Sequence, residues 1–143
     1  MPMRFDGCYC SRREAMVVAA SLVLVLVKQA RAEGHERHIA EAFRQRSIAI
    51  AAGDQPYGAV VVRAGMIIGR GASRVVQDRN IDAHAERLAI ADAMARAGSS
   101  DLFGAILYSS SRPCRTCERV AANAGISRMI YGQGAADGGA PRG

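Results

Sequence analysis

The chain has 143 residues, enough for one domain, and half of them are hydrophobic while 22% are charged. This balance is that of a folded globular domain, and it excludes a disordered or collagen-like chain. The net charge of +6 is spread along the sequence without a run of lysine or arginine, so it favours a solvated surface over a nucleic-acid partner.

Residues 1–32 are predicted to be an export signal. A run without charges over residues 15–27 follows Ser11-Arg12-Arg13, and Ala30-Arg31-Ala32 offers a small-x-small cleavage site. The run is too short to cross a hydrocarbon core comfortably, since a core needs ~20 apolar residues. The paired arginines are similar to a twin-arginine signal, which implies export of the folded protein to the periplasm and a mature chain that starts at Glu33. Two alternatives remain open, an uncleaved membrane anchor and a misassigned translation start on a cytoplasmic enzyme.

Residues 33–131 are predicted to form one layered α/β domain. The spacing of apolar residues predicts helices over 36–52, 83–97 and 114–124, which Gly53, Gly98 and Gly125 end. β-rich runs predict strands over 58–63 and 66–69, joined as a hairpin, and further strands over 105–108 and 126–131. Because helices connect the later strands, the sheet is expected to be mixed. Residues 73–82 are predicted to be a loop, and residues 132–143, mostly glycine and alanine, a disordered tail.

Two short motifs supply the ligands of a zinc ion. His84-Ala85-Glu86 stands in the first turn of one predicted helix, and Pro113-Cys114-Arg115-Thr116-Cys117 begins the next. One imidazole and two thiols can hold Zn²⁺ and leave its fourth position to water, whose pKa then falls to roughly 7. The helix start also favours the thiolate form of both cysteines. Four cysteines could instead form a disulfide scaffold, but C-x-x-C after a proline, with His-x-Glu upstream, fits a metal site better.

Glu86 is the predicted catalytic residue. It lies two residues from His84, too close along the chain to bind the same metal easily, but it can reach the water. Such a carboxylate takes the proton of the water and passes it to a leaving amine. The pattern therefore predicts hydrolytic removal of an exocyclic amino group from an aromatic heterocycle, with release of ammonia. His35 and His38, by contrast, are predicted to be surface residues of the first helix.

The two motifs together closely resemble the cytidine/deoxycytidylate deaminase superfamily, over about residues 36–131. The resemblance implies a three-layer fold with a mixed central sheet flanked by helices, one zinc ion per chain on His84, Cys114 and Cys117, and proton transfer by Glu86. The run from Pro56 to Val60 is similar to the start of a strand in guanine, cytosine and tRNA adenosine deaminases.

That branch implies a substrate pocket lined by Tyr57 and the backbone of Ala85. Ser73 stands where relatives often have an asparagine that contacts the substrate, and Arg112 replaces the glutamate that usually precedes the proline of P-C-x-x-C. Substrate-binding residues are therefore expected to be Tyr57, Ser73 and Ala85.

The leading hypothesis is an exported, zinc-dependent hydrolase that deaminates a small nucleobase or nucleoside. It is expected to form a homodimer, since small domains gain buried surface by pairing, and to contact a membrane only through the leader. The alternatives are a tRNA adenosine deaminase and a catalytically silent zinc-binding domain of the same fold. Glu86 favours catalysis, because a purely structural zinc site has no use for it.

Overall fold

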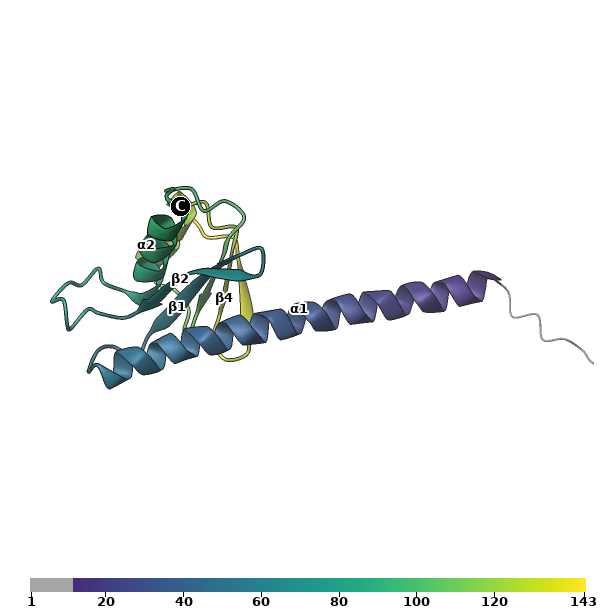
Figure 1. The fold of residues 1–143 in the computed structure, drawn as a ribbon, viewed down its shortest axis with the longest axis horizontal. Coiled ribbons are helices and arrows are strands. Elements are labelled where there is room, and N and C mark those ends of the chain that lie inside the picture. Colours follow the sequence, from purple (N-terminus) through teal and green to yellow (C-terminus); the bar gives the residue numbers. More distant parts are fainter. Residues whose placement is uncertain (1–11) are drawn as a thin grey trace, which may run out of the picture. The chain divides into compact units, whose positions relative to one another are not determined.

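A computed structural model describes residues 12–143, apart from the side chains of residues 12–15, 17–20 and 30–32. Ser11 and the residues before it, part of the predicted export signal, lie outside the described residues. The elements, drawn in Figure 1, are α1 (Arg12–Ala51), β1 (Gly58–Arg63), β2 (Met66–Ala72), α2 (Ala85–Ala97), β3 (Ile106–Ser109), α3 (Arg115–Asn123), β4 (Arg128–Tyr131) and β5 (Ala136–Gly139). The chain divides into two compact units between Glu33 and Gly34.

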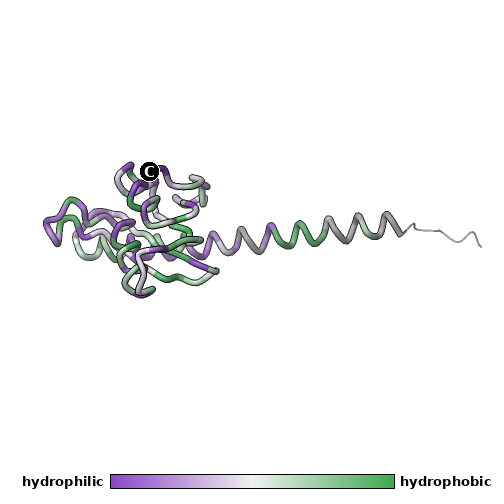
Figure 2. Tube along the Cα trace, turned by 90° about the horizontal axis from the view of Figure 1, so that it is seen from above, coloured by the Kyte–Doolittle hydropathy of each residue, from purple (hydrophilic) through white to green (hydrophobic). Residues whose placement is uncertain are grey.

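The first helix begins earlier than the sequence predicted. The expected helix covered residues 36–52, whereas α1 already includes the run without charges. Residues 26–33 are mainly good helix formers without glycine or proline, so nothing in them ends a helix. In the first unit the side chains of residues 22–27 are exposed, and hydrophobic turns of this helix are green in Figure 2. Among the helices of residues 12–143, none has both the length and the apolar character that a membrane span requires.

The strands form one mixed sheet in the order β2-β1-β3-β4-β5. β3 and β4 are parallel, because α3 crosses over between them, and each other neighbouring pair is antiparallel. The predicted α/β class with a mixed sheet between helices is therefore confirmed.

Alternate residues of β1 face two separate clusters of buried side chains. Ala59 and Val61 belong to a cluster with the inner faces of α2 and α3, while Val60 and Val62 pack with Ile39 of α1. The helices thus cover both faces of the sheet, with residues 34–51 of α1 on one side and α2 on the other (Figure 1). Because both faces are covered, β1 is a continuous apolar run rather than an alternating one.

Two glycines let the helices approach the strands closely. A Cβ at Gly71 of β2 would overlap the carbonyl oxygen of Ala85, the first residue of α2. A Cβ at Gly58 of β1 would overlap the backbone of α1 at Ala42 and Arg46. The start of α2, where the H-A-E motif lies, is therefore held directly against the sheet.

The prediction of a disordered tail from residue 132 was wrong. β5 pairs antiparallel with β4, and Gly132 and Ala135 adopt positive φ values of 74° and 50° in the turn between them. Backbone hydrogen bonds hold this strand, and they require no hydrophobic pattern. A composition rich in glycine and alanine therefore concealed an edge strand.

The prediction that His35 and His38 are surface residues was also wrong. His38 is buried on the sheet side of α1, with its ring centroid 5.0 Å from that of Tyr108. His35 is partly buried, and its Nδ1 lies 2.8 Å from the Tyr108 hydroxyl. Both residues face β3 because they lie three residues apart, about one turn of the helix.

Candidate metal centre and active site

The three predicted metal ligands lie at the starts of two helices. His84 is the N-cap of α2 and Cys114 the N-cap of α3, both in extended conformation, and Cys117 lies in the first turn of α3. Each helix follows a strand of the same sheet and packs on the same face, so the two N-termini meet. His84 and Cys114, 30 positions apart in the sequence, are thereby brought together.

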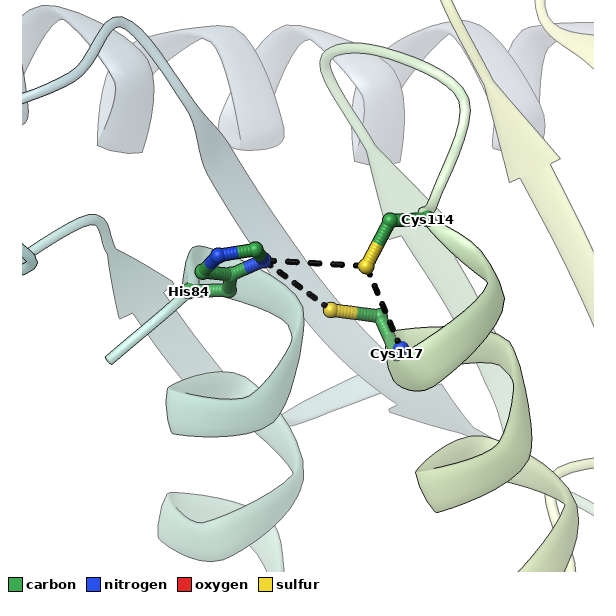
Figure 3. A group of neighbouring side chains, drawn as sticks. All are labelled: His84, Cys114 and Cys117. Carbon is green, nitrogen blue, oxygen red and sulfur yellow. Dashed lines mark hydrogen bonds between the residues drawn. The ribbon is translucent and has the colours of Figure 1, made fainter. Parts of the chain in front are cut away.

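The geometry of the three side chains fits a zinc ion. His84 Nδ1 lies 3.4 Å from Cys117 Sγ and 3.7 Å from Cys114 Sγ, and the three ligand atoms all lie within 4.8 Å of one another (Figure 3). Tetrahedral Zn–S and Zn–N bonds would place nitrogen and sulfur about 3.6 Å apart. One nitrogen and two sulfurs at this separation are the donor set of a zinc site with one open position, and His84, Cys114 and Cys117 could form such a site.

The two thiols have opposite environments. Burial raises the pKa of the Cys114 thiol, but hydrogen bonds from Thr116 and from the Cys117 N–H outweigh it and lower that pKa to about 7. Burial raises the pKa of the Cys117 thiol well above its usual range, and the nearby Glu86 carboxylate raises it further. At Cys117, burial therefore opposes the thiolate that the helix start was predicted to favour. A cation between the three ligand atoms supplies the charge that a buried thiolate needs.

Glu86 lies beside the ligands, as predicted. Its side chain is 5% exposed, and its Oε1 accepts a hydrogen bond of 2.9 Å from the hydroxyl of Ser109 at the end of β3. Glu86 also lines the same cleft as His84 and Cys114. Ser109 thus holds one oxygen of the carboxylate, and the other oxygen, Oε2, is available for proton transfer.

The cleft over the site has a volume of about 490 Å³, which suits a small heterocycle. It is lined by Gln55, Tyr57, His84, Glu86, Ser111, Arg112 and Cys114. Tyr57 therefore lies where the prediction placed it. Ala85 lies on the buried side of α2, and its predicted role, through its backbone, stays a prediction.

Ser73 does not lie in this cleft. Its side chain is fully buried, and its hydroxyl donates a hydrogen bond of 2.9 Å to Asp54. The same carboxylate accepts the backbone N–H groups of Gln55, Val76 and Gln77. Burial raises the pKa of Asp54, but these four donors outweigh it and hold that pKa below its ordinary value. The hydroxyl of Ser73 therefore joins two loops, and the predicted contact of Ser73 with the substrate stays a prediction.

Sequence reasoning missed several residues of the site. The strand predicted over 105–108 ended before Ser109, which is the last residue of β3 and holds Glu86. Gln55 and Ser111 line the cleft, and neither was predicted to do so. The signal that could have found the serines is the run 109–111, since polar residues directly after an apolar strand often lie at a ligand site.

Comparison with known families finds one match over most of the chain. The model of the cytidine and deoxycytidylate deaminase zinc-binding region matches residues 32–133. This range contains all three zinc ligands and Glu86.

Individual relatives agree with this match. The tRNA-specific adenosine deaminase of Aquifex aeolicus is 33% identical over 98 residues, which cover 68% of this chain and 65% of that protein. The guanine deaminase of Bacillus subtilis superposes with a TM-score of 0.65 at 34% identity, covering 68% of this chain and 62% of that one. A further structure, of NE0047 in complex with 2,6-diaminopurine, has a TM-score of 0.65 at 29% identity and covers 68% of this chain and 55% of its own. The chain thus spans less than two thirds of the length of each of these proteins.

Proposed function

Because this chain belongs to the cytidine and deoxycytidylate deaminase family, we propose that it is a zinc-dependent hydrolase that removes the exocyclic amino group of a nucleobase, free or as its nucleoside, and releases ammonia. The observation that carries the proposal is Glu86. This carboxylate lines the cleft beside two of the zinc ligands and is fixed by Ser109. A site that only stabilised the fold would not require it.

The residues at the cleft have separate roles in such a reaction. A zinc ion on His84, Cys114 and Cys117 supplies Lewis acidity, which makes water a nucleophile at neutral pH. Glu86 Oε2 takes a proton from that water and delivers it to the amine that leaves. Ser109 keeps the carboxylate oriented throughout, and Tyr57 offers an aromatic edge along which a heterocycle can lie.

An adenosine within tRNA is the second candidate substrate. The support is the Aquifex aeolicus relative, whose name states this activity. The support for a free purine base is the guanine deaminase and the structure solved with 2,6-diaminopurine. Because these relatives differ in substrate, the substrate of this chain has to be tested directly.

The first experiment is a panel of ammonia-release assays on zinc-loaded protein. The substrates are guanine, adenine, cytosine, their nucleosides, the monophosphates of those nucleosides and a tRNA transcript. We expect ammonia from at least one of them, and ammonia from the transcript alone would select the second candidate. Absence of ammonia from every substrate would contradict the proposal and favour a catalytically silent zinc domain.

The second experiment replaces the proton carrier. Glu86→Gln is expected to keep one zinc per chain and to lower kcat by more than about 10²-fold, since the charge that moves the proton is gone. Glu36→Gln, the same change at an exposed position of α1, is the control. Unchanged turnover in Glu86→Gln would exclude Glu86 from the mechanism.

We also propose that residues 1–32 direct export to the periplasm. The support is that the family match begins at residue 32 and that the compact units divide between Glu33 and Gly34. N-terminal sequencing of periplasmic material should begin at Glu33, and intact Met1 in the cytosol would contradict this.

A homodimer is the proposed assembly. Its support is the exposure of two large apolar side chains, Ile81 and Phe103, each almost four-fifths exposed. Light scattering of the zinc-loaded protein measures the mass, and the mass of a single chain would contradict the proposal.

A further inference from the structure

A second cleft, next to the one that holds Glu86, is lined mainly by arginine. It has a volume of about 530 Å³ and is formed by Arg112, Pro113, Arg115, Glu118, Arg119, Arg142 and Gly143. We call it the arginine cleft. Its side chains supply four guanidinium groups and one carboxylate, that of Glu118, which already accepts the backbone N–H of Arg142 at 3.2 Å.

The arginines of this cleft repeat at helical spacing around the start of α3. Arg115 is the first residue of the helix and Arg119 lies one turn later, while Arg112 precedes the helix by three residues. Like charges four residues apart destabilise a helix by repulsion, and the positive end of the helix dipole adds to the local charge. An anion bound between these side chains would relieve that repulsion.

These arginines also differ from most others of the second unit in having no acidic partner. Seven arginines of residues 34–143 pair with a carboxylate; they are Arg44, Arg70, Arg74, Arg87, Arg96, Arg128 and Arg142. Within the described part of the chain, no ion pair or side-chain hydrogen bond is made by Arg112, Arg115 or Arg119, and all three are exposed. Their guanidinium groups are therefore available for an external anion.

The two clefts are continuous through Arg112, which lines both of them. A group attached to a heterocycle beside Glu86 can therefore extend past Arg112 toward Arg115 and Arg119. Guanidinium groups match the shape and the charge of phosphate, to which they donate paired hydrogen bonds.

We propose that the arginine cleft binds a phosphate carried by the ribose of the base that is deaminated, so that the substrate is a nucleotide, either free or within a strand. The inference rests on the proposed function for the position of the base. The phosphate site itself depends only on Arg112, Arg115 and Arg119.

Calorimetric titration tests this proposal on zinc-loaded protein that carries Glu86→Gln, so that no ligand is consumed. The ligands are guanosine, adenosine and cytidine, each compared with its 5′- and 3′-monophosphate. The measured quantity is the ratio of the nucleoside Kd to the monophosphate Kd, which is insensitive to the fraction of folded protein because both values come from one preparation. We expect a ratio of about ten or more for at least one pair, decreasing as salt rises from about 50 to 200 mM.

The variant is Arg115→Gln with Arg119→Gln, and the matched control is Arg63→Gln with Arg79→Gln, which removes two arginines outside both clefts. The first pair is expected to reduce the ratio to near one, while the second pair keeps it. A ratio near one in the starting protein, or a high ratio that survives loss of Arg115 and Arg119, would overturn the proposal.

A single-stranded RNA of ten nucleotides distinguishes the two sources of phosphate. Binding at least about tenfold tighter than that of the monophosphate, with the same dependence on Arg115 and Arg119, identifies a strand, and equal or weaker binding identifies a free nucleotide. Ammonia from nucleosides together with a ratio near one would overturn this inference and leave the proposed function intact. A high ratio together with no ammonia from any substrate would support the phosphate site and contradict the proposed function.

Discussion

The two faces of the sheet differ in the size of their side chains and in what those side chains hold in place. The face toward α2 and α3 is packed largely with alanines from the two helices, at positions 85, 89, 93, 121 and 124. The face toward α1 is packed with larger groups, among them Ile39, Val62, Tyr108 and Ile130. Both faces nevertheless have a point where the backbones of helix and strand approach closely, at Gly71 toward α2 and at Gly58 toward α1.

The predicted chemistry lies on the face with the small side chains. The candidate zinc ligands and Glu86 belong to the starts of α2 and α3, and Gly71 lets the start of α2 lie directly against the sheet. The α1 face contains none of these residues, and Nδ1 of its buried His38 has no hydrogen-bond partner among the described residues. The α2 and α3 face therefore sets the geometry of the site, and the α1 face mainly contributes buried surface.

The largest expected effect is on the zinc site. Replacing Cys117 by serine removes a sulfur ligand, so the zinc content should fall from one per chain to near zero and turnover should fall by more than about 10²-fold. Metal analysis and thermal unfolding with and without a chelator measure this. The chelator should lower the Tm of the unmodified protein and leave that of Cys117→Ser unchanged, and full zinc content in the variant would exclude Cys117 as a ligand.

The next effect separates the two faces directly. Gly71→Ala and Gly58→Ala each add one methyl group between a strand and a helix, toward α2 and α1 respectively. Each should lower the free energy of unfolding by about 1 to 3 kcal/mol, because the backbones are forced apart. Only Gly71→Ala should also weaken zinc binding, since α2 contains His84. Equal zinc affinities in the two variants, measured by competition with a chromophoric chelator, would contradict the assigned difference between the faces.

A smaller effect concerns the residue that holds Glu86. Ser109→Ala removes the hydrogen bond to Oε1, so kcat should fall about 10- to 100-fold while zinc content is retained, as expected for a bond of about 1.5 to 3 kcal/mol to a charged group. Ser110→Ala is the control, since the Ser110 hydroxyl accepts the N–H of Gly58 and does not contact Glu86. An equal loss of kcat in both variants would mean that the run of serines acts only through the shape of the loop.

The smallest effect is a pH dependence of stability on the α1 face. Burial lowers the pKa of His38, and the charge of Arg37 and the neighbouring His35 lower it further. The unfolded chain therefore binds a proton more readily, with a pKa near 6.5, and the free energy of unfolding should decrease as the pH falls below that value. Urea unfolding of chelated protein at about pH 5 and 7 measures the decrease, which should be smaller in His38→Gln. Identical decreases in the two proteins would show that His38 does not titrate on unfolding.

The sequence predicted the elements of the second unit well wherever glycine and apolar spacing defined them. The hairpin, the crossover helices and the mixed sheet were all found, because each depends on short-range patterns. β5 was missed because a strand at the edge of a sheet needs only backbone partners. The burial of His35 and His38 was missed because polar and apolar residues are mixed around this helix, so the sequence does not show which side packs on the sheet.

The sequence by itself was enough to select the candidate zinc ligands and the predicted catalytic carboxylate. His84 and Glu86 stand two residues apart and Cys114 and Cys117 three apart at the start of a helix, so local geometry fixes how each motif presents its atoms. Only the tertiary structure decided that Ser109 holds Glu86, that Ser73 donates to Asp54, and that Arg142 joins the arginines around the start of α3 in one cleft. Such contacts join residues more than a dozen positions apart, and their geometry depends on strand register and helix placement, which no local spacing encodes.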